Sequence, residues 1–221
     1  STISAAYGAN GPQNPVTLAS YLGILNGAVL IAIKQVQKDQ DTDADGQPDQ
    51  ASTQAFLDAL DETDGTLPGG AFPDILVPLK GDSLLLFQQL ALHCDVQSGI
   101  RYRAERTGIV GLSAGTQPNE VGDKAQAVGA TRLRMVYPDI YALSLSQFDG
   151  TVENFLVDGT YMAAAVAGGR TRPSIDVATP WTNDRVFGFD SIARTLDAVE
   201  QNQVAVRGVT VISQENSVIK I

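Results

Sequence analysis

Short apolar runs alternate with helical segments along most of this 221-residue chain. The predicted strands are largely apolar, as expected where a sheet is covered on both faces, and they comprise residues 28–33, 74–78, 107–112, 132–138, 208–212 and 217–221. The predicted helices comprise residues 15–27, 51–62, 83–97, 120–130, 159–169 and 191–203. This order predicts an α/β fold with a largely parallel sheet and helices on both faces.

Several helical segments begin or end at residues that favour a helix terminus. Pro15 suits the first turn of the helix over 15–27, and Gly27 suits its end. The predicted N-caps of later helices are Asp82, Asn119, Asp158 and Asp190. No linker rich in proline, serine or charge divides the chain, so we expect an irregular arm over 1–14 and a single α/β domain over 15–221.

The composition excludes some partners. The formal charge of −10 and the pI near 4.4 disfavour direct contact with the phosphates of nucleic acids. The longest apolar stretch, residues 22–33, contains Asn26 and is shorter than the roughly 20 residues of a membrane span, so we expect no membrane insertion. Cys94 is the single cysteine, which rules out an intrachain disulfide.

Residues 159–168, Gly-Thr-Tyr-Met-Ala-Ala-Ala-Val-Ala-Gly, resemble the segment that carries the nucleophile of subtilisin-type proteases. In those enzymes a serine follows the Gly-Thr pair, whereas Tyr161 occupies that position here. The reacting atom is therefore missing. Either the nucleophile lies elsewhere in the chain, or this scaffold performs no hydrolysis.

A second candidate nucleophile is Ser113, which lies in the Gly-Leu-Ser-Ala-Gly sequence of residues 111–115. In hydrolases with this motif the serine stands on a sharp turn between a strand and a helix, and the histidine follows later in the chain. Pro118 would interrupt the required helix, and the single histidine, His93, precedes the serine. We interpret 111–115 as a glycine-rich turn at the end of a strand.

His93 lies inside a predicted apolar helix, directly before Cys94. The residues around it do not match those around a subtilisin-type base, and neighbours one position apart on a helix point in different directions. A Cys–His dyad is therefore disfavoured. We interpret His93 as a partly buried helix residue, and we assign no catalytic residue and no cofactor to the chain.

Acidic residues at alternating positions suggest a cation site. Asp41, Asp43 and Asp45 match the start of a calcium-binding loop, and Asp49 stands at its ninth position. Ser52 fills the twelfth position, where an EF-hand requires a bidentate glutamate, so any affinity for calcium should be weak. The other interpretation is an exposed acidic turn before a helix, where carboxylates favour the N-terminus. We assign no metal site to these residues.

Taken in order, several segments resemble parts of the tail sheath proteins of contractile-tailed bacteriophages. The segments are residues 73–81, 84–115, 128–141, 158–183 and 191–212. The most specific of them is 158–183, which resembles that family's Gly-hydrophobic-Ala helix followed by a loop of the form Ala-Pro-x-Asn, here residues 178–183. Each motif carries little information, and it is their order and spacing that make the resemblance specific.

The resemblance implies a fold and a role. It implies the non-catalytic, subtilisin-like domain of sheath proteins, which agrees with Tyr161 in place of a serine. It implies a virion protein, assembled in the host cytoplasm, whose partners are other sheath subunits, the tail tube and the baseplate. Contraction of such a sheath drives the tube through the host envelope during genome delivery. In that family the chain continues beyond the Gly-Val-x-x-Ile strand, so we expect a fragment that lacks the C-terminal sheath domain.

Two alternatives remain open at this point. A subtilisin-like or other serine hydrolase is disfavoured because no complete triad is visible among Tyr161, Ser113 and His93. A calcium-stabilised extracellular binding module depends on the acidic segment from Asp41 to Asp49 alone.

Overall fold

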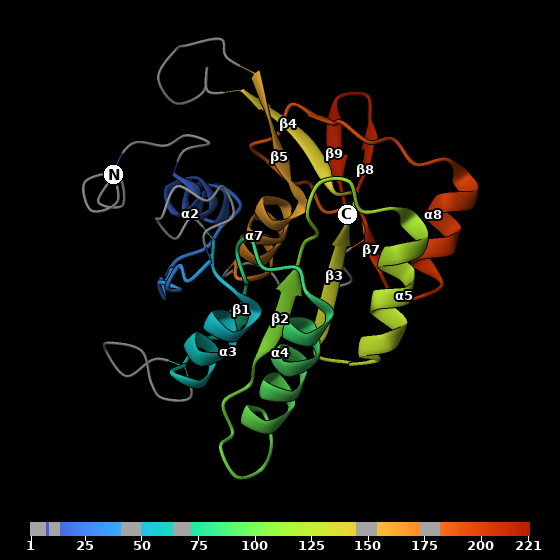
Figure 1. Cartoon of the computed structure of the whole chain (residues 1–221). Helices are drawn as coiled ribbons and strands as arrows, with labels where there is room; N and C mark the ends of the chain where they lie inside the picture. The colour runs from blue at the N-terminus through green and yellow to red at the C-terminus, as the bar shows by residue number, and fades with distance from the viewer. Residues whose placement is uncertain (1–7, 9–13, 41–49, 64–71, 145–153, 173–181) are drawn as a thin grey trace.

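The centre of the molecule is a four-stranded parallel sheet, which confirms the predicted fold class. The computed structural model describes residues 8, 14–40, 50–63, 72–144, 154–172 and 182–221. The strand order is β1-β2-β3-β7. The strands are β1 Ile75–Leu76, β2 Thr107–Val110, β3 Leu133–Tyr137 and β7 Thr210–Val211, each shorter than its predicted segment (Figure 1).

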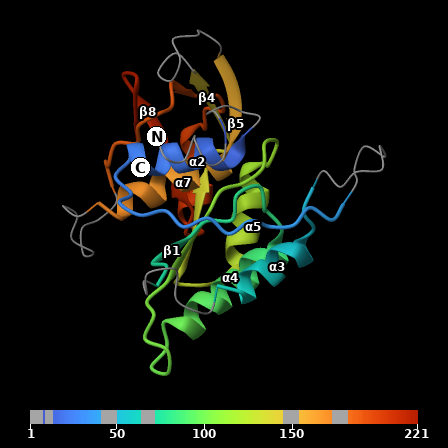
Figure 2. The same cartoon turned by 90° about the vertical axis from the view of Figure 1, so that its left-hand side faces the viewer.

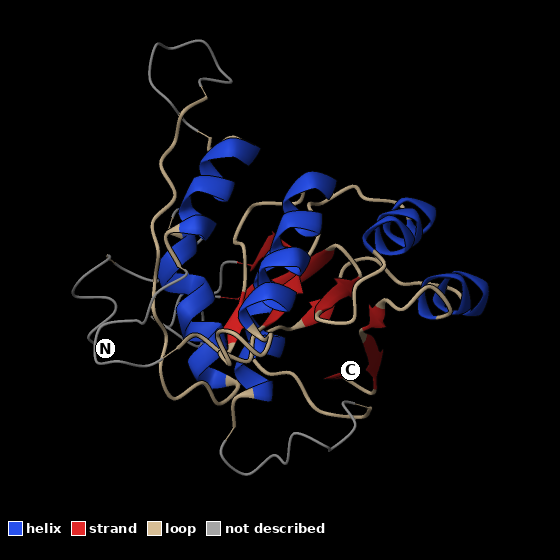
Figure 3. Cartoon of the chain, turned by 90° about the horizontal axis from the view of Figure 1, so that it is seen from below, coloured by secondary structure: helices blue, strands red, loops and turns tan. Residues whose placement is uncertain are grey.

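Helices cover both faces of this sheet, and alternate strand residues contact opposite layers. Ile109 and Val136 pack in one cluster with helix α7 (Gly159–Arg170) and helix α2 (Pro15–Leu25). Val110 and Met135 pack in a second cluster on the other face, formed with α4 (Leu84–Gln97), α5 (Pro118–Val128) and α8 (Ala198–Ala205). Seen from below, the strands lie among the helices (Figure 3). This period-2 alternation buries both faces of the sheet.

The helix termini follow local capping rules, although three of the four predicted caps, Asp82, Asn119 and Asp190, are wrong. Asn14 caps α2, whose first residue is the predicted Pro15, and Asp158 caps α7 as predicted. The cap of α4 is Ser83 and not Asp82, because the Ser83 hydroxyl accepts from Leu86 N. The cap of α5 is Gln117 and not Asn119. Gln117 forms a reciprocal pair of hydrogen bonds with Glu120, and Pro118 occupies the first turn.

Helix α3 (Thr53–Asp61) confirms the predicted helix over 51–62 and packs against α4. Its cap is Ser52, whose hydroxyl accepts from Ala55 N at 3.1 Å. Figure 2 shows α3 and α4 together on one side of the molecule, away from α2 and α7. No described helix combines the length and apolarity that a membrane-spanning segment requires.

A three-stranded antiparallel sheet, not predicted from the sequence, adjoins the parallel one. Its order is β5-β4-β6, and the strands are β5 Asn154–Asp158, β4 Ile140–Ser144 and β6 Ser191–Ile192. The predicted helix over 191–203 is therefore wrong in its first half. Asp190 N and Ala193 N donate to the carbonyls of β4, so this stretch is strand and Asp190 caps no helix. Helix α8 begins at Ala198, and its cap is Asp197, which forms a capping box with Glu200.

Residues 28–33 do not form the predicted buried strand. They belong to no helix or strand, and Val29 and Leu30 expose 77% and 70% of their surface. The prediction failed because an apolar run becomes a strand only when a neighbouring strand supplies hydrogen-bond partners. Within the described ranges, no backbone group of residues 29–33 has such a partner. The predicted terminal strand is present as β9 (Val218–Lys220), in a hairpin with β8 (Ser213–Glu215).

Candidate functional site

A functional site is expected at the carboxyl edge of the parallel sheet, because open parallel sheets bind ligands there. Lys80 and Asp82 follow β1, Ser113 follows β2 and Asp139 follows β3. Helix α7 begins at the same edge, since Gly159 N donates to the Leu112 carbonyl at 2.9 Å. Two of the predicted candidates, Ser113 and Tyr161, therefore lie close to this edge.

Tyr161 is part of a packed polar cluster. Its side chain is buried in the first turn of α7, and the Lys80 ammonium lies 4.8 Å from the centre of its ring. Lys80 Nζ is 2.5 Å from Asp158 Oδ2, while the other oxygen, Asp158 Oδ1, caps the helix at Thr160 N. Burial, with a smaller effect of Asp158, raises the pKa of Tyr161. The phenol therefore stays neutral and stabilises the helix start through a cation–π contact.

Ser113 lies in a turn, as predicted, and not on a nucleophile elbow. Its backbone N donates to Asp82 Oδ2 at 3.3 Å, and its carbonyl accepts from the Thr116 hydroxyl at 2.8 Å. Helix α5 starts at Pro118, five residues beyond the serine, so no helix N-terminus follows directly. The sharp strand–turn–helix geometry that exposes a catalytic serine is therefore absent here.

Backbone contact joins the two elements that carry these candidates. A Cβ placed on Gly111 would lie 1.9 Å from the carbonyl oxygen of Gly159. The end of β2 and the start of α7 are therefore in direct contact, which only glycine permits.

Asp139 is a buried acid that sequence reasoning missed. Its Oδ2 accepts a hydrogen bond from Gly115 N at 2.6 Å. Its Oδ1 forms an ion pair with Arg194, whose Nε lies 2.6 Å away but is not aligned for a hydrogen bond. Nearby, the Tyr137 hydroxyl donates to the Thr116 carbonyl at 2.9 Å, and burial together with Asp139 raises the pKa of Tyr137 to about 12. These groups hold the turn of residues 113–116 in place. The signal that could have found Asp139 is its position directly after a strand.

His93 lies at the opposite edge of the sheet. Its Nε2 is 2.7 Å from Arg106 Nη1, and because a guanidinium can only donate, His93 accepts this hydrogen bond. Arg106 directly precedes β2 and Ser113 follows its far end, so an extended chain of seven residues, roughly 20 Å, separates them. The histidine is partly buried, as predicted, and the structure does not bring it to either candidate nucleophile.

The described residues hold no metal cluster. Among them, no group of three or more histidine, cysteine or acidic side chains is arranged to hold a metal ion. The acidic segment of Asp41, Asp43, Asp45 and Asp49 lies outside the described residues, so the weak calcium site stays a prediction. Cys94 is fully buried, and burial raises the pKa of its thiol to about 12, which leaves it in the unreactive thiol form.

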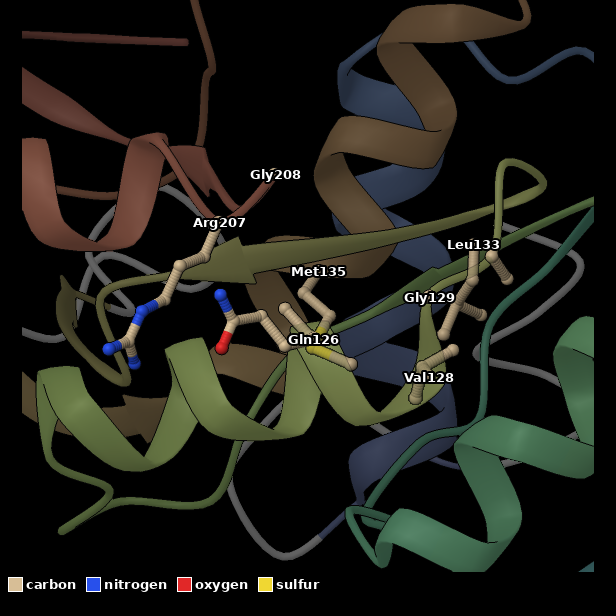
Figure 4. Close-up of a pocket in the computed structure, with 9 residues that line it drawn as sticks. Gln126, Val128, Gly129, Leu133, Met135, Arg207 and Gly208 are labelled. Atoms are coloured by element: carbon tan, nitrogen blue, oxygen red, sulfur yellow. The ribbon is translucent and has the colours of Figure 1, made fainter.

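A shallow groove of about 210 Å³ lies between α5 and the turn after α8. Figure 4 shows the Arg207 side chain at one end of this groove and Val128 and Leu133 at the other. Arg207 Nη1 pairs with Asp123 Oδ1 at 2.8 Å and donates to the Asn119 carbonyl. The groove is lined by backbone, apolar side chains, the Gln126 amide and the already paired Arg207, and none of these lining side chains is an acid or a nucleophile.

Comparisons with known proteins bear on the fold. No protein-family model matches the sequence. No curated protein matches it either. Among the solved structures that share the fold are two sheath tail proteins. A sheath tail protein from Desulfitobacterium hafniense is 14% identical, with a TM-score of 0.53 over 80% of this chain and 35% of its own.

The second structure is a sheath tail protein from Listeria innocua, also 14% identical, with a TM-score of 0.50 over 87% of this chain and 40% of its own. The chain thus spans well under half the length of the solved chains that it matches. The predicted loop over 178–183 lies outside the described residues except for Thr182 and Asn183. The chain is therefore similar in fold, over most of its length, to one part of two sheath tail proteins.

Proposed function

We propose that this chain is a structural subunit of a contractile tail sheath and that it performs no catalysis. The observation that carries the proposal is the likeness in fold, over 80–87% of the chain, to two sheath tail proteins. Fold alone does not determine function, so the site geometry matters as well. Tyr161 in place of a serine, the closed contact between Gly111 and Gly159, and the remote His93 all support a scaffold without chemistry.

The interior of the molecule suits a subunit that moves as a rigid body. In a contracting sheath, each subunit would keep its fold while its contacts with neighbouring subunits rearrange, and this would drive the tail tube through the host envelope. Packed interiors transmit force without deforming, whereas interfaces have discrete alternative arrangements. The two buried clusters on either side of the parallel sheet would provide that rigidity.

The proposal names partners and a location. The partners are other copies of the subunit, the tail tube and the baseplate, and the location is the sheath of a phage tail, assembled in the host cytoplasm. Residues 15–221 would form one α/β unit of the subunit. Two copies of this chain, each with a formal charge of −10, repel one another at long range, so residues 1–221 alone should be monomeric at micromolar concentration.

Electron microscopy tests the proposal. The complete product of the gene that encodes this chain, once purified, should form tubes of constant diameter in negative stain. Sedimentation of the same sample should show large particles, and residues 1–221 produced alone serve as the matched control. A complete gene product that stays monomeric, or forms only irregular aggregates, would contradict the structural role.

A further inference from the structure

The residue that ends α2 belongs to a chemically reactive pair. Asn26 is followed by Gly27, and an Asn-Gly pair is especially prone to deamidation, because glycine has no Cβ to shield its backbone nitrogen. The Gly27 nitrogen loses its proton and attacks Asn26 Cγ, the Cγ–Nδ2 bond breaks, and ammonia leaves. Water then opens the cyclic imide at either carbonyl, which leaves aspartate or isoaspartate at position 26. Water is the only co-reactant.

The fold requires this pair of residues. Gly27 directly follows the C-cap Asn26 and has a φ of +118°, a backbone conformation that favours glycine at a helix end. A Cβ at position 27 would also lie 2.2 Å from the Arg172 side chain. Asn26 is 2% exposed, and its side-chain amide supplies both donors and an acceptor to the surrounding backbone. The reactive pair is therefore built into the end of α2.

Three hydrogen bonds hold the Asn26 side chain, and they are here called the Asn26 clamp. Asn26 Nδ2 donates to the Leu22 carbonyl at 2.8 Å and to the Phe187 carbonyl at 2.9 Å. Asn26 Oδ1 accepts from Phe187 N at 2.9 Å. The clamp joins the end of α2 to a segment 161 residues further along the chain. The nitrogen that would leave as ammonia is thus engaged through both of its hydrogens.

The backbone beside the clamp is fixed as well. Gly27 N, the attacking atom, donates to the Ile24 carbonyl at 2.9 Å. Arg172 covers the turn, and its Nε donates to the Asn26 carbonyl at 2.5 Å. Asn26 has helical backbone angles, with φ −88° and ψ −3°, and ring closure requires a large rotation of ψ to bring Gly27 N onto Cγ. Attack therefore requires that the clamp and this turn open first.

The reaction would also prevent the clamp from closing again. A carboxylate only accepts hydrogen bonds, so aspartate at position 26 would lose both donors and place a negative charge against the Leu22 and Phe187 carbonyl oxygens. A buried charge without donors is costly. Isoaspartate adds a methylene group to the main chain and displaces Gly27 from its turn. Either product therefore favours the open arrangement.

We propose that Asn26 is a deamidation site that the closed clamp protects, and that its conversion to aspartate or isoaspartate holds the end of α2 open. The reaction proceeds only through molecules whose clamp is already open, so its rate reports that population. Because deamidation is irreversible, opened molecules accumulate with time. The site needs no partner copy and does not depend on the proposed structural role.

The first test uses the unchanged chain of residues 1–221, incubated in mildly alkaline buffer with and without denaturing urea. Peptide mapping by mass spectrometry measures conversion, and an isoaspartate-specific methyltransferase identifies the product. In urea, Asn26 should convert about as fast as Asn10, which also precedes a glycine. In the folded chain, Asn26 should convert about a hundredfold more slowly than in urea, equivalent to about 2.8 kcal/mol of opening free energy. No conversion in urea would overturn the site, and equal rates with and without urea would overturn its protection.

The second test loosens the turn. Arg172→Ala removes the bond to the Asn26 carbonyl and uncovers Gly27, so it should speed conversion in the folded chain by about tenfold. Arg207→Ala is the matched control, because Arg207 bonds to Asn119 and Asp123 on α5, and it should leave the rate unchanged. Equal rates in the two variants would overturn local opening of the clamp in favour of opening by global unfolding.

The third test asks whether the product stays open. Asn26→Asp should speed hydrogen exchange of the Gly27 amide by about tenfold or more, because the buried carboxylate weakens the turn. Asn183→Asp makes the same charge change at an exposed residue of the segment that leads to Phe187, and it should leave this exchange unchanged. Equal exchange in the two variants would show that conversion does not open the helix end. If Asn26→Asp does not fold, the deamidated fraction of the unchanged chain, separated by ion exchange, gives the same measurement.

Discussion

The two helical layers on either face of the parallel sheet pack against their neighbours in different ways. On the α7 side, backbone contacts backbone. A Cβ added to Gly168 would lie 2.0 Å from the carbonyl oxygen of Gly23 in α2, and a Cβ added to Gly111 would lie 1.9 Å from the carbonyl oxygen of Gly159. On the α4 side, large side chains such as Phe87 and Leu90 fill the space against the sheet. Adding an atom should therefore damage the first layer, and removing atoms should damage the second.

The largest effect is expected from Phe87→Ala on the α4 side. Phe87 is fully buried, so its truncation should lower the free energy of unfolding by about 3–5 kcal/mol. Leu85→Ala is the matched control, because Leu85 is on the same helix but half exposed, and it should cost less than about 1.5 kcal/mol. Urea denaturation of both variants measures the difference, and equal costs would show that α4 is not seated as described.

Gly168→Ala tests the α7 side with the opposite change. The added methyl group meets the backbone of α2, which cannot move aside, so the expected loss is about 3 kcal/mol. The neighbouring Gly169→Ala meets only the end of the Arg172 side chain at 3.6 Å, and it should stabilise α7 by up to about 1 kcal/mol. If both variants were equally stable, the close approach of α2 and α7 would be wrong.

The buried thiol of the α4 layer predicts a pH dependence. Burial raises the pKa of Cys94 from 9.0 to about 12, so above pH 9 the unfolded chain loses this proton while the folded chain keeps it. Stability should therefore fall as the pH rises from 9 to 10, with a slope of up to about 1.4 kcal/mol per pH unit from this group. Cys94→Ala should show a flatter slope over the same interval in urea titrations. An unchanged slope would mean that Cys94 is not the group responsible.

A smaller effect is expected at the start of α7. Asp158→Ala removes the N-cap bond to Thr160 N, and it should cost about 1 kcal/mol. Asn119→Ala is the matched control, because Asn119 is a predicted cap whose helix is in fact capped by Gln117, and it should cost less than about 0.5 kcal/mol. Thermal unfolding of the two variants distinguishes them, and a reversed order would restore Asn119 as the cap.

The smallest expected effect is on reactivity at Ser113. A fluorophosphonate probe should not label the folded chain, because His93 lies at the other edge of the sheet and α5 begins too late to form a nucleophile elbow. Ser113→Ala should therefore give the same signal as the unchanged chain. Labelling that disappears in Ser113→Ala would reopen the hydrolase interpretation.

The candidate site was predicted in part. The missing serine at Tyr161, the turn at Ser113 and the partly buried His93 could all be inferred from neighbouring residues. The cluster of Asp139 with Arg194 and the contact between Arg106 and His93 could not, because each joins residues from separate elements. Such pairs leave no periodic signal in the sequence.

The sequence by itself determined most of the helices and the buried strands of the parallel sheet. The hydrogen bonds of a helix are local, so caps such as Asp158 and proline at position 15 suffice to place α7 and α2. The apolar runs of β2 and β3 were equally clear, because burial on both faces requires them. Only the tertiary structure decided which apolar runs become strands. Within the described part of the chain, no strand lies beside residues 28–33, whereas Ser191 and Ile192 have β4. The hydrogen bonds of a strand come from a partner distant in the sequence.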